Sequence, residues 1–149
     1  MLITALQILV LSAYLLAVYN RYGILQSISH STYKWVGNQR YWFTAMCWGL
    51  GVLNLFQGME GWGVLVAVAM GFTGITINYR SVGTHLHNIS AITAILGGLV
   101  GLWVVHGIWL PFGLFVPIAI CLWFISGDNR IWWIEIVAFA LILIGYTLR

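Results

Sequence analysis

The sequence predicts an all-α fold, a polytopic bundle of about six transmembrane helices. Of its 149 residues, 62% are hydrophobic and only 6% are charged, whereas a soluble domain carries roughly 25% charged residues. The apolar residues fall into runs separated by short polar connectors, and each run is about as long as a helix that crosses a ~30 Å hydrocarbon layer. A chain so poor in charge cannot cover itself with a water-compatible surface, so lipid is its expected solvent.

The apolar runs divide the chain into six expected spans, which form a single membrane domain over residues 1–149. The first run lacks the positive start and small-residue cleavage pattern of a secretory signal peptide, so we expect a retained helix. Only His106 and Gly107 separate the fourth span from the fifth, and one long kinked helix, giving five spans, is the alternative. Pro117 within the fifth span is expected to kink that helix. The expected spans cover residues 2–19, 41–56, 62–77, 89–105, 108–125 and 131–148.

Basic residues predict the orientation of the chain in the membrane. The connectors after the first, third and fifth spans hold five of the six: Arg21, Lys34, Arg40, Arg80 and Arg130. The opposite side holds only Arg149. The positive-inside rule therefore places those three connectors in the cytoplasm and both termini outside, and a bacterial inner membrane is the expected location. The basic residues form no patch, so nucleic-acid binding is not expected.

The longest polar stretch covers residues 20–40. Its apolar residues are spaced so that a short helix is expected to lie on the membrane surface: Ile24, Leu25, Ile28 and Trp35. Between them lies a hydroxyl-rich cluster: Ser27, Ser29, His30, Ser31 and Thr32. A serine beside a histidine suggests a nucleophile and its base. No acid is near and no nucleophile elbow is present, so a solvated connector that caps helices is favoured.

Two histidines form an H-x-H pair, His85 and His87, in the connector expected over residues 78–88. The topology places them on the same side as His30 and Asp128, and these four residues are the candidate metal-binding and catalytic set, of a zinc type that activates water. On a helix, however, His85 and His87 would point about 200° apart, and only one would face the interior. The favoured alternative is that the four are polar residues at headgroup level, so no cofactor is predicted and a divalent metal is the alternative.

Glu135 is the one acidic residue expected within a span. Ionisable groups inside membranes are rare and costly, which makes Glu135 a functional candidate. Alternatively it reaches the polar edge, pairs with Arg130, or lies near a helix N-terminus, where negative charge is favoured. A path for a proton or cation would need further polar groups at membrane depth. Asn54, Thr73, Thr76 and Thr93 are available, although such residues more often form hydrogen bonds between helices.

Small residues recur at four-residue spacing in the third and fourth spans: Gly63, Ala67 and Gly71, then Ser90, Ala94 and Gly98, with Gly97 and Gly101 offset. Such ridges let helices approach closely, so these two spans are the expected tight pair. The same faces could bind a second copy or another membrane protein, and membrane lipids are the other expected partner. Cys47 and Cys121 lie in apolar runs and are expected to be buried and unpaired.

Two short motifs, SISHSTY (residues 27–33) and THLHNISA (residues 84–91), resemble those of uncharacterised small polytopic membrane proteins of bacteria and their phages. The resemblance implies a similar helical membrane fold and no activity. Membrane hydrolases that carry a Ser, Asp and HxxxH set are not matched, because the chain has no HxxxH.

Three classes of function remain from the sequence. The first, which is favoured, is a small accessory protein that binds other spans or lipid. The second is a transporter or channel for a small solute or a proton, which would work through Pro117, Glu135 and the threonines. The third is a metal- or His-dependent enzyme that acts on a lipid. A cavity reaching mid-membrane past Glu135 would favour the second class.

Overall fold

The computed structural model describes residues 1–76 and 83–149, and these residues form helices and no strand, which confirms the all-α prediction. Three described segments are long and apolar enough to cross a membrane: Leu2–Tyr22, His85–His106 and Gly127–Thr147. The elements in chain order are α1 (Leu2–Tyr22), α2 (Ser31–Lys34), the 3-10 turn η1 (Gly37–Arg40), α3 (Tyr41–Leu55), α4 (Glu60–Thr76), α5 (Gly83–His106), α6 (Leu110–Ile125), the 3-10 turn η2 (Gly127–Asn129) and α7 (Arg130–Thr147).

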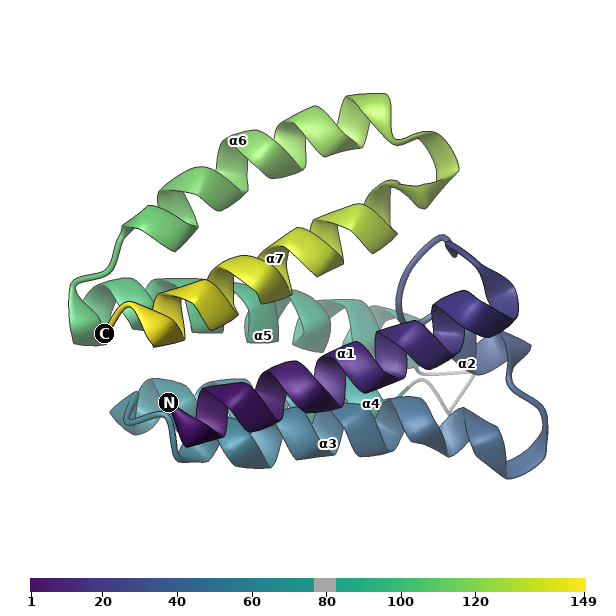
Figure 1. The fold of residues 1–149 in the computed structure, drawn as a ribbon, viewed down its shortest axis with the longest axis horizontal. Helices are drawn as coiled ribbons and strands as arrows, with labels where there is room; N and C mark the ends of the chain where they lie inside the picture. The colour runs from purple at the N-terminus through teal and green to yellow at the C-terminus, as the bar shows by residue number, and fades with distance from the viewer. Residues whose placement is uncertain (77–82) are drawn as a thin grey trace.

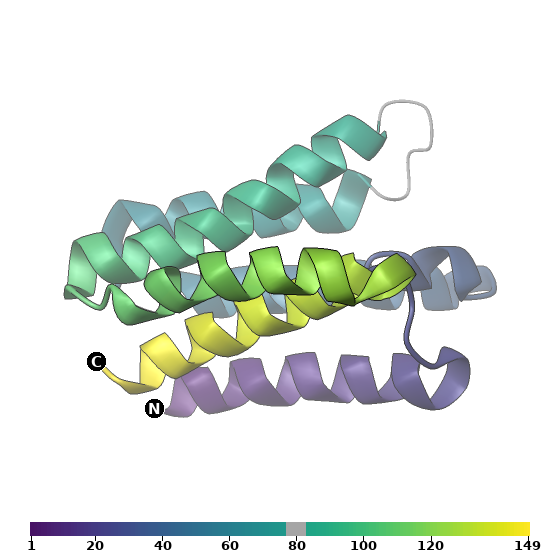
Figure 2. The ribbon, with the colours of Figure 1, turned by 90° about the horizontal axis from the view of Figure 1, so that it is seen from above.

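Five of the long helices form a closed ring. In order around it, α1 packs on α3, α3 on α4, α4 on α5, α5 on α7, and α7 again on α1. Their inward faces share apolar core residues, to which α1, α3, α4, α5 and α7 all contribute. The sixth long helix, α6, packs mainly on α7 and lies outside the ring (Figures 1 and 2). Most side chains of α6 are therefore exposed or only partly buried.

The expected tight pair of helices is confirmed, because α4 and α5 make the most extensive contact in the described structure. The small residues that permit this close approach lie on α5, and the ridge predicted on α4 does not take part. A Cβ at Gly97 would lie 3.1 Å from Val66 of α4, and the Gly101 position faces Trp62 of the same helix. By contrast, Gly63 faces the α3 backbone and Gly71 has open space around it, so the α4 ridge does not form this interface.

A connector was expected over residues 78–88. This prediction is wrong for residues 83–88, and residues 78–82 lie outside the described residues. Helix α5 begins at Gly83, so both His85 and His87 lie on its first two turns. At the other end of α5, Gly107 adopts φ 69°, a left-handed conformation that glycine tolerates and that ends the helix. The alternative of one long kinked helix is therefore wrong, and Pro117 lies within a separate α6.

The prediction that a helix between Ile24 and Trp35 lies on the membrane surface is also wrong. Only Ser31–Lys34 is α-helical there, and Leu25, Ile28 and Trp35 are buried in the core shared with the ring. The segment is held against α7, because the Trp132 N–H donates to the Gln26 carbonyl at 3.1 Å. Residues 23–30 thus cover one end of the ring, whereas both chain termini lie at the opposite end (Figure 1).

Candidate functional site

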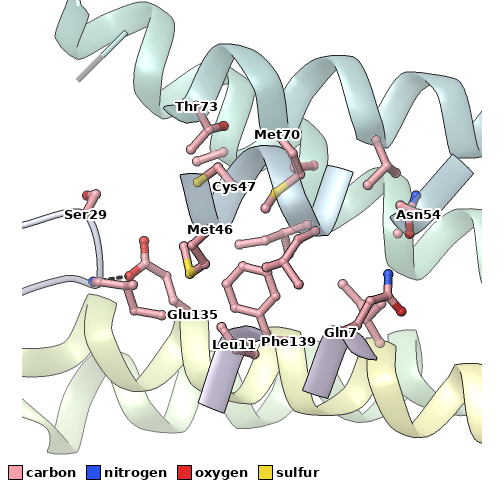
Figure 3. Close-up of a pocket in the computed structure, with 18 of the residues that line it drawn as sticks. Gln7, Leu11, Ser29, Met46, Cys47, Asn54, Met70, Thr73, Glu135 and Phe139 are labelled. Atoms are coloured by element: carbon pink, nitrogen blue, oxygen red, sulfur yellow. Dashed lines mark hydrogen bonds between the residues drawn. The ribbon is translucent and has the colours of Figure 1, made fainter. Parts of the chain in front are cut away.

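A pocket of about 70 Å³ lies inside the ring. All five ring helices and the segment over residues 23–30 contribute to its wall, and Figure 3 shows side chains from these elements converging on it. The middle of the wall is apolar, and polar side chains gather toward the two ends. The apolar wall includes Leu11, Phe43, Met46, Leu50, Val66, Met70, Phe139, Ile142 and Leu143.

Glu135 lies at the end of the pocket that residues 23–30 cover. It is on the second turn of α7 and partly buried, and its Oε2 accepts a hydrogen bond from the backbone N–H of Ile28 at 2.6 Å. The dashed line in Figure 3 marks this bond. Arg130 does not pair with it, contrary to one sequence interpretation, because its guanidinium lies over the Trp123 ring, 4.2 Å from the centroid. No described side chain provides Glu135 with a positive partner.

His87 lines the same pocket, whereas His85 is exposed, so the prediction that only one of them would face the interior is confirmed. The His87 side chain is 7% exposed, and its Nδ1 lies 3.0 Å from the Thr73 carbonyl oxygen. Because a carbonyl only accepts, Nδ1 carries the proton. The ring also packs against Phe43 at 6.1 Å between centroids. These contacts hold the imidazole in the pocket wall.

The opposite end of the pocket is closed by a network of amides and hydroxyls. Gln57, fully buried, donates to Gln7 and to Thr4, and accepts from the Arg149 guanidinium at 2.6 Å. Beside it, the Tyr146 hydroxyl donates to the Asn54 side-chain oxygen. Each polar group at this end therefore has its partner within the protein.

The polar residues expected within spans divide into two kinds. Asn54 bonds to α7 through Tyr146, and the Thr73 Oγ1 lies 3.1 Å from the Ser90 Oγ on α5, so both connect helices as predicted. Thr76 and Thr93 donate instead to carbonyls of their own helices, those of Phe72 and Ile89.

Sequence reasoning missed Gln7, Gln57 and Tyr146 as residues at the end of the pocket. Gln7 is the only strongly polar side chain in the apolar first span, and a lone amide at membrane depth is a signal that could have found it. Gln57 belongs to a turn, and Tyr146 resembles an ordinary interfacial aromatic residue. For these two no comparable signal exists.

The four candidate metal ligands do not lie close to one another in the structure. Among the described residues, no three His, Cys, Asp or Glu side chains are close enough together to hold a metal ion. His87 lies in the pocket, His85 and Asp128 are exposed, and the His30 ring packs edge-on against Tyr33. Both cysteines are free, but Cys121 is exposed on α6, contrary to expectation, while Cys47 lies in the pocket wall.

The hydroxyl cluster is not the solvated connector that the sequence favoured. Ser29, Ser31 and Thr32 are buried, and their hydroxyls bond to Ser27, to the Ile28 carbonyl and to the Ser29 carbonyl, respectively. Ser31 also bonds to the Tyr14 hydroxyl of α1. These hydroxyls hold the segment in the bundle, and none has a histidine side chain as its hydrogen-bond partner among the described residues.

The sequence matches no known protein-family model, and no curated protein or solved structure matches the chain. What the site can do therefore follows from its geometry. It offers one carboxylate at the edge of a small, mainly apolar pocket, which is an arrangement for binding a small ligand or a proton. Among the described residues that line it, Ser29 bonds to Ser27, His87 to the Thr73 carbonyl and Glu135 to the Ile28 N–H.

Proposed function

We propose that the chain is a multi-pass membrane transporter that binds a small solute in the pocket inside its helix ring. The observation that carries this proposal is the pocket itself, together with Glu135 at one of its ends. An accessory protein needs no such pocket, and its apolar outer faces are equally well explained by contact with lipid. The transporter class therefore accounts for more of the structure than the accessory class that composition and helix faces favoured.

We propose six spans for this transporter. The three long apolar segments suit a ~30 Å hydrocarbon layer, and α3, α4 and α6 run alongside them in the bundle (Figures 1 and 2). These helices have 15, 17 and 16 residues, or about 22–26 Å at 1.5 Å per residue. A bilayer accommodates spans a few ångströms short by local thinning. Six spans also agree with the two termini lying at one end of the bundle.

The orientation and the membrane are part of the same proposal. Arg21, Lys34 and Arg130 lie toward the end covered by residues 23–30, and Arg149 lies at the opposite end. The positive-inside rule would place the Glu135 end of the pocket in the cytoplasm and both termini outside, in a bacterial inner membrane. Solute would then move through the pocket, from the end covered by residues 23–30 to the end closed by the Gln57 network.

Transport can be tested with the full chain reconstituted in liposomes. A stopped-flow light-scattering assay would follow entry of small solutes (urea, acetamide, glycerol and methylammonium chloride), with protein-free liposomes as background. We expect protein-dependent flux of at least one solute in the wild type. The matched variant is Ala94→Leu, which adds three carbons to a pocket-lining position. The proposal fails if no solute shows protein-dependent flux, or if the flux is unchanged by Ala94→Leu in protein that is correctly folded by gel filtration and circular dichroism.

A further inference from the structure

We infer that the pocket takes a small monovalent organic cation with an apolar body, a short alkylammonium ion, whose charged head pairs with Glu135. This inference rests on the proposed function and specifies its ligand. It is carried by an unmatched charge, by the composition of the pocket wall and by the pocket's size.

The unmatched charge is the carboxylate of Glu135. Among the described residues, its one hydrogen-bond partner is the Ile28 N–H. Two of the basic side chains described at this end are engaged elsewhere: Arg130 stacks on Trp123, and Arg21 donates to Gln39 and lies over the Trp35 ring. An ionised carboxylate away from bulk water is stable only with a partner. A cationic ligand supplies the partner that the described protein groups do not.

The pocket wall determines the rest of the ligand. Met46, Met70 and Phe139 line the pocket together with Glu135, and Met46 lies beside it (Figure 3). Thioethers and aromatic rings are soft apolar surfaces, and an aromatic face also attracts a cation. A sugar or polyol would leave its hydroxyls without partners against this wall. The wall therefore fits an alkyl body rather than a hydroxylated one.

The far end of the pocket limits the ligand to one charge. Asn54 and Gln7 line the pocket there, but their side-chain oxygens already accept from Tyr146 and Gln57. The Arg149 guanidinium, bonded to Gln57, adds positive charge to that end. A second ammonium group would meet no carboxylate there, and an anion crossing the pocket would be repelled by the Glu135 carboxylate. A monovalent cation fits both ends.

The pocket volume limits the length of the ligand. At about 70 Å³, it is roughly half the size of an apolar cavity of about 150 Å³ that holds benzene. Benzene has six non-hydrogen atoms, so a ligand of about three to four non-hydrogen atoms is the expected size. Propylammonium has four, and so do the neutral 1-propanol and the anionic acetate, which makes these three a matched set of probes.

Saturation-transfer NMR on the purified full chain in detergent tests the inference, with empty micelles as background. We expect propylammonium to bind the wild type, and 1-propanol and acetate not to bind measurably. Glu135→Gln keeps an oxygen that can accept from Ile28 but removes the charge, and it should weaken propylammonium binding about tenfold or more. The control is Asp128→Asn, which removes one acidic charge from the exposed turn before α7 and should leave binding unchanged.

Ala94→Leu fills the pocket without touching the carboxylate, and it should also abolish propylammonium binding. The inference is overturned if propylammonium does not bind, if its binding survives Glu135→Gln, or if it falls equally in Asp128→Asn. Binding of 1-propanol or acetate that Ala94→Leu removes would overturn the cation specificity and leave the proposed pocket function standing. The proposed function is overturned as well if none of the probes binds and if the liposome assay shows no protein-dependent flux that is lost in the Ala94→Leu variant.

Discussion

The Glu135 carboxylate of α7 and the Ile28 backbone N–H are joined by a 2.6 Å hydrogen bond across 107 residues of sequence. This bond ties the segment over residues 23–30 to the helix that completes the ring. It also gives a backbone donor, in a residue only 2% exposed, the partner that it would otherwise lack. Glu135 therefore has two separable roles, one through its oxygen and one through its charge.

Glu135→Ala and Glu135→Gln separate these roles by their effect on stability. The alanine leaves the Ile28 N–H without an acceptor, which costs about 1–3 kcal/mol of unfolding free energy. For a chain of this size, each 1 kcal/mol lowers the unfolding midpoint by about 2–4 °C. We expect Glu135→Ala to unfold several degrees below the wild type, and Glu135→Gln to unfold close to it. Thermal unfolding in detergent, followed by tryptophan fluorescence, measures both.

Asp128→Ala is the control for loss of an acidic side chain, because Asp128 is exposed on the turn before α7. Its free energy of unfolding should stay within about 0.5 kcal/mol of the wild-type value. Equal stability of Glu135→Ala and wild type would contradict a structural role for the bond to Ile28.

Gln57 at the opposite end is predicted to be the most sensitive polar residue of its network. Gln57→Leu removes the partner of Gln7 and of Thr4 together, and we expect a loss of about 2–3 kcal/mol, since two buried polar groups are left unpaired. Gln39→Leu is the matched control. Among the described residues, its side chain bonds to Arg21 in an exposed contact, and the loss of this contact should cost little. The same thermal unfolding assay compares Gln57→Leu with Gln39→Leu. Equal unfolding midpoints for these two variants would rule out a stabilising role for the buried network.

The long helices could be predicted from the sequence because hydropathy alone marks a segment that avoids water. Five of the six expected spans agree with helices to within about three residues at each end. The fourth begins earlier than expected, at Gly83. Polar residues such as His85 and His87 were taken to mark a connector, but a buried bond to the Thr73 carbonyl makes His87 acceptable inside the bundle.

The pocket could be predicted only in part. Glu135, Asn54 and Thr73 stand out as polar residues in apolar runs, and all three line the pocket. The burial of Ile28 and Ser29 could not be read from local sequence, because it depends on contacts with α7 more than a hundred residues away. A polar stretch between spans ordinarily lies in the interface, and only a specific tertiary acceptor makes its burial favourable.

Gly74 is predicted to be essential for the approach of α4 to α3, whereas Gly71 on the same helix is not. A Cβ at Gly74 would lie 3.0 Å from the Cys47 Cβ and 3.2 Å from the Thr44 Cα, and a backbone atom cannot easily move away. Gly74→Ala should therefore destabilise the protein by about 1–3 kcal/mol. Gly71→Ala, with open space around it, should be neutral or raise stability by up to about 1 kcal/mol through helix propensity. If both variants unfold at the same midpoint, the α3–α4 contact is not as close as described.

Single cysteines at the two ends of the bundle test the six-span proposal. In a Cys47→Ala/Cys121→Ser background, Phe56→Cys reports on the exposed turn after α3, near the termini, and Asp128→Cys reports on the turn before α7. We expect a membrane-impermeant maleimide to label Phe56→Cys on intact cells and Asp128→Cys only after the membrane is permeabilised. This pattern follows from the positive-inside rule, because Arg21, Lys34 and Arg130 lie toward the Asp128 end of the bundle and Arg149 lies at the opposite end. The reverse pattern would invert the orientation, and labelling of both positions on intact cells would show that the two ends of the bundle do not lie on opposite sides of the membrane.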